Sequence, residues 1–173
     1  MTKGEPDLTI DLNDLAARLT AAEDRLAILD LEGEYARSWD VGDAAGWAAL
    51  FTPDGAFAMT AVGDQAASTI RGTAALAAFC TQVDGIYRGL HFIGLPRIAL
   101  KGDTARAQIH FQWLGLFRRG GAHSGERHAR GYYDVTYRKV DGAWKIAHRG
   151  ETLIAGQIIE DFDSKVRVEW DGD

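Results

Sequence analysis

The sequence predicts an α+β protein in which N-terminal helices pack on a mainly antiparallel sheet. Apolar residues recur at helical spacing in the first half of the chain and alternate with polar residues at period two in the second half. Helices followed by strands are typical of an α+β fold, whereas strands alternating with helices build a parallel sheet. With 173 residues, 46% of them hydrophobic, the chain can bury one core. We therefore expect one domain over residues 11–159, a flexible lead-in over residues 1–10, and a charged tail or edge strand over residues 160–173.

Three helices are expected, each from its own start signal. Thr20 followed by Glu23 matches a capping box. The helix after it has an apolar face made of Ile28, Leu31, Tyr35 and Trp39. A second helix over residues 44–51 has Asp43 as its N-cap, and a third over residues 74–83 has Thr73 in that role.

The sheet is expected to begin with short strands and to end with hairpins. The short strands cover residues 56–61 and 69–71, after a turn over residues 52–55. Four longer strands pair around tight turns, over residues 90–100, 104–117, 127–139 and 143–154. A glycine-rich loop is expected over residues 118–125. Period-two spacing of Val166, Val168 and Trp170 favours a short edge strand in the tail.

Charge and composition exclude several partners and cellular contexts. The net charge is −6 and no basic stripe is present, which argues against nucleic acid and against an anionic membrane surface. No apolar run is long enough to span a bilayer, and the polar, acidic N-terminus does not match a signal or transit peptide. Cys80 is the single cysteine and lies in an apolar stretch, so we expect a buried thiol and a cytoplasmic protein.

The familiar cofactor and nucleophile motifs do not occur in the sequence. It has no phosphate-binding glycine loop, no dinucleotide fingerprint and no Gly-x-Ser-x-Gly elbow. His123 and His128 are five residues apart near the expected loop, which is not the spacing of a zinc-binding helix pair. We therefore expect neither a cofactor nor a metal.

Three residues stand out by position, and each has a structural as well as a functional interpretation. Asp40 ends an apolar helix face, where the helix dipole disfavours a carboxylate. It is either a solvated helix stop or a carboxylate kept for a partner. His91 lies in an apolar strand and is either a core histidine or a base. Arg149 follows the run from Trp144 and is either an exposed strand residue or a site cation.

Two runs resemble the SnoaL-like proteins of the nuclear transport factor 2-like superfamily. The first combines Tyr35, Asp40 and Asp43 with the stretch Trp47 to Gly55, and the second runs from Tyr137 to Ile146. Within that group, residues 91–94 and the Asp-Gly-x-Trp-Lys hairpin are similar to scytalone dehydratase. The resemblance covers about residues 20 to 155. It implies a cystatin-like cone, with helices packed on a strongly curved sheet around a pocket.

The resemblance also implies a set of site residues. Asp40 would orient His91, and His91 would remove a proton as general base. Tyr35 and Arg149 match further active-site positions of dehydratases and dehydrochlorinases in this group. Four residues are expected to contact substrate: Trp39, Met59, His110 and Tyr133. Met59 stands where scytalone dehydratase has a tyrosine, and His110 falls several residues from that enzyme's second histidine, so scytalone is not the expected substrate.

Strict strand alternation conflicts with one of these assignments. It places Trp144 and Arg149 on opposite faces of their strand. Either a β-bulge lies between them or Arg149 points away from the pocket.

The leading hypothesis is a cofactor-independent lyase, dehydratase-like, or an isomerase acting on a small hydrophobic, aromatic or polycyclic oxygenated molecule. The alternatives are a non-catalytic ligand-binding domain and the small structural subunit of an aromatic-ring-hydroxylating dioxygenase. We also expect a homodimer or homotrimer, because Trp113, Phe117 and Trp170 exceed what one compact core requires.

Overall fold

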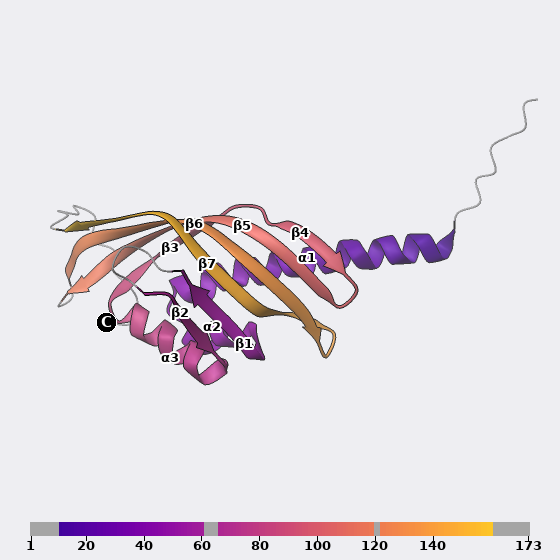
Figure 1. The fold of residues 1–173 in the computed structure, drawn as a ribbon, viewed down its shortest axis with the longest axis horizontal. Helices are drawn as coiled ribbons and strands as arrows, with labels where there is room; N and C mark the ends of the chain where they lie inside the picture. The colour runs from indigo at the N-terminus through magenta and orange to yellow at the C-terminus, as the bar shows by residue number, and fades with distance from the viewer. Residues whose placement is uncertain (1–10, 61–65, 120–121, 161–173) are drawn as a thin grey trace, which may run out of the picture.

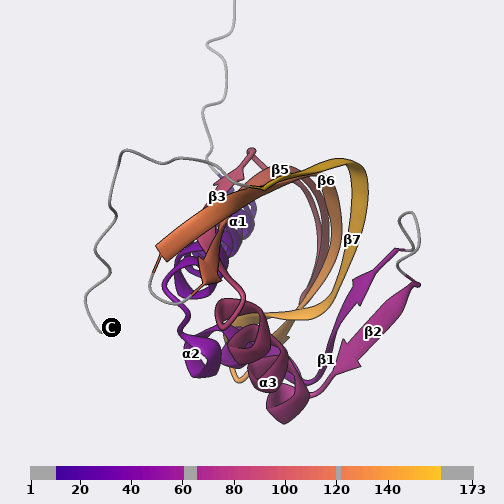
Figure 2. The same cartoon turned by 90° about the vertical axis from the view of Figure 1, so that its left-hand side faces the viewer.

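A layer of helices covers the concave side of one curved sheet in the computed structural model (Figures 1 and 2). The structure describes residues 11–60, 66–119 and 122–160. In that part of the chain the strand order is β2-β1-β7-β6-β5-β3, and β4 pairs with the other end of β5. Among the described strands, only the β1–β7 pair is parallel. The expected α+β fold with a mainly antiparallel sheet is therefore confirmed.

The first helix, α1 (Leu12–Asp40), begins earlier than the expected capping box. The carboxylate of Asp11 accepts hydrogen bonds from the backbone N–H groups of Asn13 and Asp14 and serves as the N-cap. The expected start at Thr20 is therefore wrong. The alanines and leucines around Thr20 and Glu23 favour helix on both sides, so the helix runs through the box.

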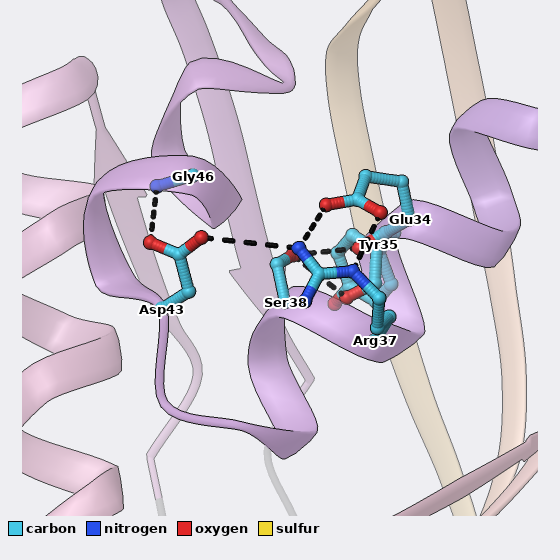
Figure 3. Close-up of polar contacts among 6 residues, drawn as sticks. All are labelled: Glu34, Tyr35, Arg37, Ser38, Asp43 and Gly46. Carbon is cyan, nitrogen blue, oxygen red and sulfur yellow. Dashed lines mark hydrogen bonds and ion pairs between the residues drawn. The ribbon is translucent and has the colours of Figure 1, made fainter.

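A short turn joins α1 to α2 (Ala44–Ala49), and Figure 3 shows the polar contacts that fix it. Asp43 caps α2 as expected, accepting a hydrogen bond from the N–H of Gly46 at 2.8 Å. Arg37 pairs with Glu34 and reaches Asp43 at 3.9 Å. These contacts hold the end of α1, where Asp40 lies, against the start of α2.

The third helix, α3 (Thr73–Asp84), lies beside α2 at the mouth of the curved sheet (Figure 2). Its N-cap is Gly72, with no side-chain hydrogen bond, so the expected capping role of Thr73 is wrong. The cysteine of this helix, Cys80, is buried as expected.

The strands differ from expectation at several boundaries. The expected strand over residues 90–100 is two strands, β3 (Tyr87–Ile93) and β4 (Arg97–Lys101), because Pro96 interrupts the ladder. Phe51 belongs to β1 (Phe51–Met59) rather than to the second helix, and β2 (Ser68–Arg71) pairs with it.

The three longest strands include much of the segment that was expected to be a glycine-rich loop. They are β5 (Thr104–Arg119), β6 (Ala122–Val140) and β7 (Ala143–Glu160). Pairing of β5 with β6 continues to Arg119 and Ala122, so the ladder extends through much of the segment expected as a loop. The expected edge strand around Val166, Val168 and Trp170 lies outside the described residues.

A β-bulge in β7 decides which side chains face the helices. Tyr137 pairs with Ile146, but the preceding Thr136 pairs with His148, so Ala147 is an extra residue. The bulge changes the alternation, and both Trp144 and Arg149 are buried. Of the two possibilities for Arg149, the structure has the bulge.

Candidate active site

Asp40 and His91 form a two-point contact between the end of α1 and β3. Asp40 Oδ1 is 2.7 Å from His91 Nδ1, and Asp40 Oδ2 accepts the backbone N–H of His91 at 2.8 Å. The two side chains are only 12% and 4% exposed. An ionised carboxylate can only accept, so the proton on the ring lies on Nδ1 and Nε2 carries a lone pair that can accept. These bonds also offset the unfavourable position of a carboxylate at a helix C-terminus.

Two buried tyrosines stand next to the imidazole. Tyr133 Oη is 3.4 Å from His91 Nε2, and the ring of Tyr35 packs edge-on to His91 at 6.0 Å. Burial raises the pKa of both phenols, against the opposing charge of Arg149. Both hydroxyls therefore stay protonated and can donate hydrogen bonds at neutral pH.

Arg149 lies behind these tyrosines and does not line the cavity. Its guanidinium carbon is 3.6 Å from the ring centroid of Tyr35 and 4.0 Å from that of Tyr133. Nη1 donates to both carboxylate oxygens of Glu32 at 2.9 Å, and Tyr137 Oη donates to the same carboxylate at 2.8 Å. Burial alone would lower the pKa of Arg149, but the Glu32 charge raises it above its ordinary value. The buried pair of Arg149 and Glu32 therefore packs against the rings of Tyr35 and Tyr133.

A cavity of about 180 Å³ opens beside His91. Most of its walls are apolar and aromatic, formed by Phe57, Phe79, Phe111, Trp113 and Leu153. Four of the sequence-predicted site residues other than His91 also line it: Tyr35, Trp39, Met59 and Tyr133. The structure therefore brings together residues that are distant in the sequence.

Glu151 is the acidic residue of the cavity wall. In the sheet it is the register partner of Tyr133 on one side and of Met59 on the other. Burial raises its pKa to about 7, although the positive charges of Arg127 and Arg149 oppose the shift. A carboxyl group that is half protonated near neutral pH can donate or accept a proton.

The remaining predicted residues lie elsewhere. His110 is exposed on β5, because its neighbours Ile109 and Phe111 point inward and strand alternation turns it outward. His128 lies in β6 and contacts Glu126 at 2.7 Å. Trp113 is buried in the cavity wall, which removes it from the apolar surplus that suggested self-association.

Sequence reasoning missed Glu32 and Glu151, although both carry a positional signal. Glu32 falls on the apolar face of α1, four residues after Ile28, where a charge needs a buried partner. Glu151 follows Arg149 by two residues and therefore shares its face of the strand. Because the bulge at Ala147 changes the alternation, counting by twos from Trp144 does not place Glu151 on the inward face.

The comparisons with known proteins identify the family. Residues 20–150 match the SnoaL-like domain, so the chain belongs to the SnoaL-like family. A nuclear transport factor 2-like protein with a cystatin-like fold from Novosphingobium aromaticivorans is 29% identical, with 87% of this chain and 92% of that chain covered and a TM-score of 0.63. The cone expected from the sequence is confirmed. No curated protein matches the sequence.

Two further solved structures share the fold at lower identity. A hexachlorocyclohexane dehydrochlorinase of type 2 has a TM-score of 0.71 at 17% identity, with 90% of this chain and 99% of that chain covered. A candidate scytalone dehydratase from Novosphingobium aromaticivorans has a TM-score of 0.67 at 19% identity, with 86% and 92% covered. At these identities the likeness establishes the fold.

Two further features concern the residues that the structure describes. They contain no group of three or more His, Cys, Asp or Glu side chains placed to hold a metal ion. Among them, no helix has the length and apolar character needed to cross a membrane.

Proposed function

We propose that this protein is a cofactor-independent lyase, dehydratase-like, or an isomerase that removes a proton from a small hydrophobic, oxygenated substrate. The observation that carries this proposal is the contact of 2.7 Å between Asp40 and His91 at the wall of a largely apolar cavity. A core histidine needs one polar partner. This histidine has a carboxylate on one ring nitrogen and leaves the other nitrogen toward the tyrosines.

His91 acts as the general base. Asp40 fixes the tautomer with the proton on Nδ1 and stabilises the imidazolium that forms when Nε2 takes a proton. The carbon that loses this proton lies next to a substrate carbonyl, and the electron pair moves onto the carbonyl oxygen. Tyr35 and Tyr133 donate hydrogen bonds to that oxygen. Arg149 is a positioning residue, because it touches the tyrosines rather than the cavity.

Glu151 acts as the general acid when a hydroxyl group leaves. Protonated Glu151 gives its proton to the departing oxygen as the carbon–oxygen bond breaks, so the products are water and a conjugated carbonyl compound. The proton on His91 then returns to the Glu151 carboxylate through solvent, which restores both groups. In isomerisation, the proton on His91 returns to a different carbon.

The cavity sets the substrate class. Its volume of about 180 Å³ and its aromatic walls fit one ring bearing a short oxygenated chain. Trp39 and Met59 contribute apolar contacts to that ring. Arg127 adds a positive charge to the wall, which favours a carbonyl or other electron-rich group.

Hydrogen exchange tests the proton abstraction directly. We would incubate the protein in D₂O with 4-phenylbutan-2-one and follow loss of the signals of protons next to the carbonyl by NMR. A second assay uses 4-hydroxy-4-phenylbutan-2-one, whose dehydration gives an enone detected by its ultraviolet absorption. We expect His91→Gln to lower the exchange rate by about 10² to 10⁴-fold and Asp40→Asn to lower it by about 10²-fold.

The matched control is His110→Gln, since this histidine is exposed on β5 and away from the cavity. Its exchange rate should equal that of the unmodified protein. Exchange that survives His91→Gln would contradict the proposal. Binding of both ketones without exchange would favour a ligand-binding domain, and co-purification with an iron-containing large subunit would favour a dioxygenase small subunit.

A further inference from the structure

The N-terminal half of α1 carries a row of exposed leucines. Leu12, Leu15, Leu19, Leu26 and Leu29 are between 37% and 74% exposed. Their spacing alternates between three and four residues once Ala22 is included, which is the a and d pattern of a coiled coil. Gly33 continues the same row and has open space around its α-carbon. From Leu12 to Leu29 the row extends for about 26 Å along the helix.

This leucine row lies on the face of α1 opposite the core. The helix buries Ile28, Leu31 and Tyr35 against the sheet. At 100° per residue, the centre of the leucine row falls about half a turn from the centre of that buried face. A second helix could therefore pack on the leucines while the rest of the domain stays on the opposite side of α1.

The first part of α1 projects past the sheet, as Figure 1 shows on its right-hand side. Every residue from Leu12 to Glu23 is exposed. The first contacts with the sheet are those of Asp24, which binds Trp144 and Lys139, and of Arg25, which donates to the carbonyl of Ile98. A helix segment of this length is marginal alone in water, so a packing partner would stabilise it substantially.

The charges beside the row select the partner and its direction. Arg18 and Arg25 occupy g positions, whereas Glu23 and Asp30 occupy e positions. In a parallel pair, each g residue faces the e residue five positions later in the other helix, so Arg18 meets Glu23 and Arg25 meets Asp30. In an antiparallel pair, g faces g and e faces e, which places like charges together. The only contact of Arg18 within the described residues is an exposed ion pair with Asp14, which contributes little and can be exchanged.

We propose that the leucine row binds the same row of a second copy of this chain, with the two α1 helices parallel in a two-stranded coiled coil. The domains then lie on opposite sides of the coil, with both cavities free. This interface is independent of the proposed reaction, since the residues that α1 contributes to the site and its support, Glu32, Tyr35, Trp39 and Asp40, do not belong to the leucine row.

The mass in solution tests the interface. Light scattering of the purified protein should give two chains of 18.9 kDa each. Leu19→Glu should raise the dissociation constant by about 100-fold or more, because two buried leucines are lost per dimer. The matched control is Ala17→Glu, which adds the same charge on the opposite side of the helix and should leave the dimer intact. Leu19 is exposed, so circular dichroism should show a folded domain in both variants.

Two outcomes would overturn this interface. One is a monomer at tens of micromolar for the unmodified chain. The other is a dimer that resists Leu19→Glu but dissociates with Leu90→Glu, since Leu90 and Phe92 form a second exposed apolar patch on β3.

Cross-linking tests the direction. Leu15→Cys and Ala22→Cys each place a thiol at a d position, where parallel helices bring a residue next to its own copy. Both variants should form disulfide-linked dimers on oxidation, against a background in which Cys80 is buried. An antiparallel pair can cross-link at one of these positions at most, so a single reactive position would overturn the parallel arrangement.

Charge exchange gives an independent check. Arg18→Glu alone should weaken the dimer about threefold to tenfold by opposing Glu23, and Arg18→Glu combined with Glu23→Arg should restore it. A single exchange that strengthens association would instead indicate antiparallel helices and overturn the proposal.

Discussion

At the residue scale, two buried carboxylates of the site differ in what they hold. Asp40 binds the imidazole of His91, whereas Glu32 pairs with Arg149, whose guanidinium stacks on Tyr35 and Tyr133. Removing one member of a buried ion pair leaves the other desolvated and unpaired, which costs far more than the pair contributes. The structure therefore predicts that Glu32 supports stability as well as the site.

We predict that Glu32→Gln lowers the free energy of unfolding by about 3 to 5 kcal/mol, because the Arg149 charge then stays buried without a counter-ion. Urea unfolding followed by tryptophan fluorescence would measure this loss. The control is Glu34→Gln, two residues further along the same helix. The ion-pair partner of Glu34 is Arg37, whose side chain is 55% exposed. It should change stability little. Equal losses for the two variants would contradict the assignment.

The raised pKa of Glu151 predicts that the free energy of unfolding depends on pH. Burial raises its pKa from 4.5 to about 7 in the folded state, so the folded protein holds this proton more tightly than the unfolded chain. Stability from this group is therefore present below pH 4.5 and is lost as the pH rises to about 7.

Glu151→Gln removes that loss. We expect the variant to match the unmodified protein in urea unfolding near pH 4.5 and to be more stable by roughly 1 to 3 kcal/mol at pH 8. A stability difference that is constant between these pH values would show that Glu151 titrates alike in both states. In the proposed reaction Glu151 is the acid and His91 is the base, so we predict that the variant loses more dehydration activity than hydrogen exchange.

At the element scale, the long strands bend through bulges and through close approaches of neighbouring backbones, of which Gly131 is an example. Gly131 lies at a second register shift between β6 and β7. A β-carbon built at Gly131 would lie 1.9 Å from the carbonyl oxygen of Thr152, which is backbone and cannot move aside. This contact lets the strands curve around the cavity.

We predict that Gly131→Ala destabilises the protein by at least about 3 kcal/mol or prevents folding, because two backbones must separate. The matched control is Gly33→Ala in α1, where nothing lies within 4 Å of the added carbon. That variant should gain about 0.5 to 1 kcal/mol from helix propensity. The midpoints of thermal unfolding of the two variants would test this prediction. A Gly131→Ala variant as stable as the unmodified protein would contradict the close approach of the two backbones.

At the scale of the whole molecule, much of the fold followed from local signals. The Asp43 cap, the hairpin turns and the period-two strands all depend on neighbours in the sequence, and the structure has them where expected. Boundaries were predicted less well. Asp11 rather than Thr20 is the N-cap of α1, because several polar residues near the start of the helix can cap it and helix propensity alone does not choose among them.

The sequence by itself determined the fold class, the family resemblance and the prominence of Asp40 and His91, because each rests on residue types at short spacing. Only the tertiary structure decided which side chains share the cavity. The bulge at Ala147 turns Arg149 inward, alternation turns His110 outward, and Glu151 meets Tyr133 only through sheet register. Such choices depend on which strands pair and in what register. Pairing between distant segments is set by packing of the whole chain and leaves no local signal.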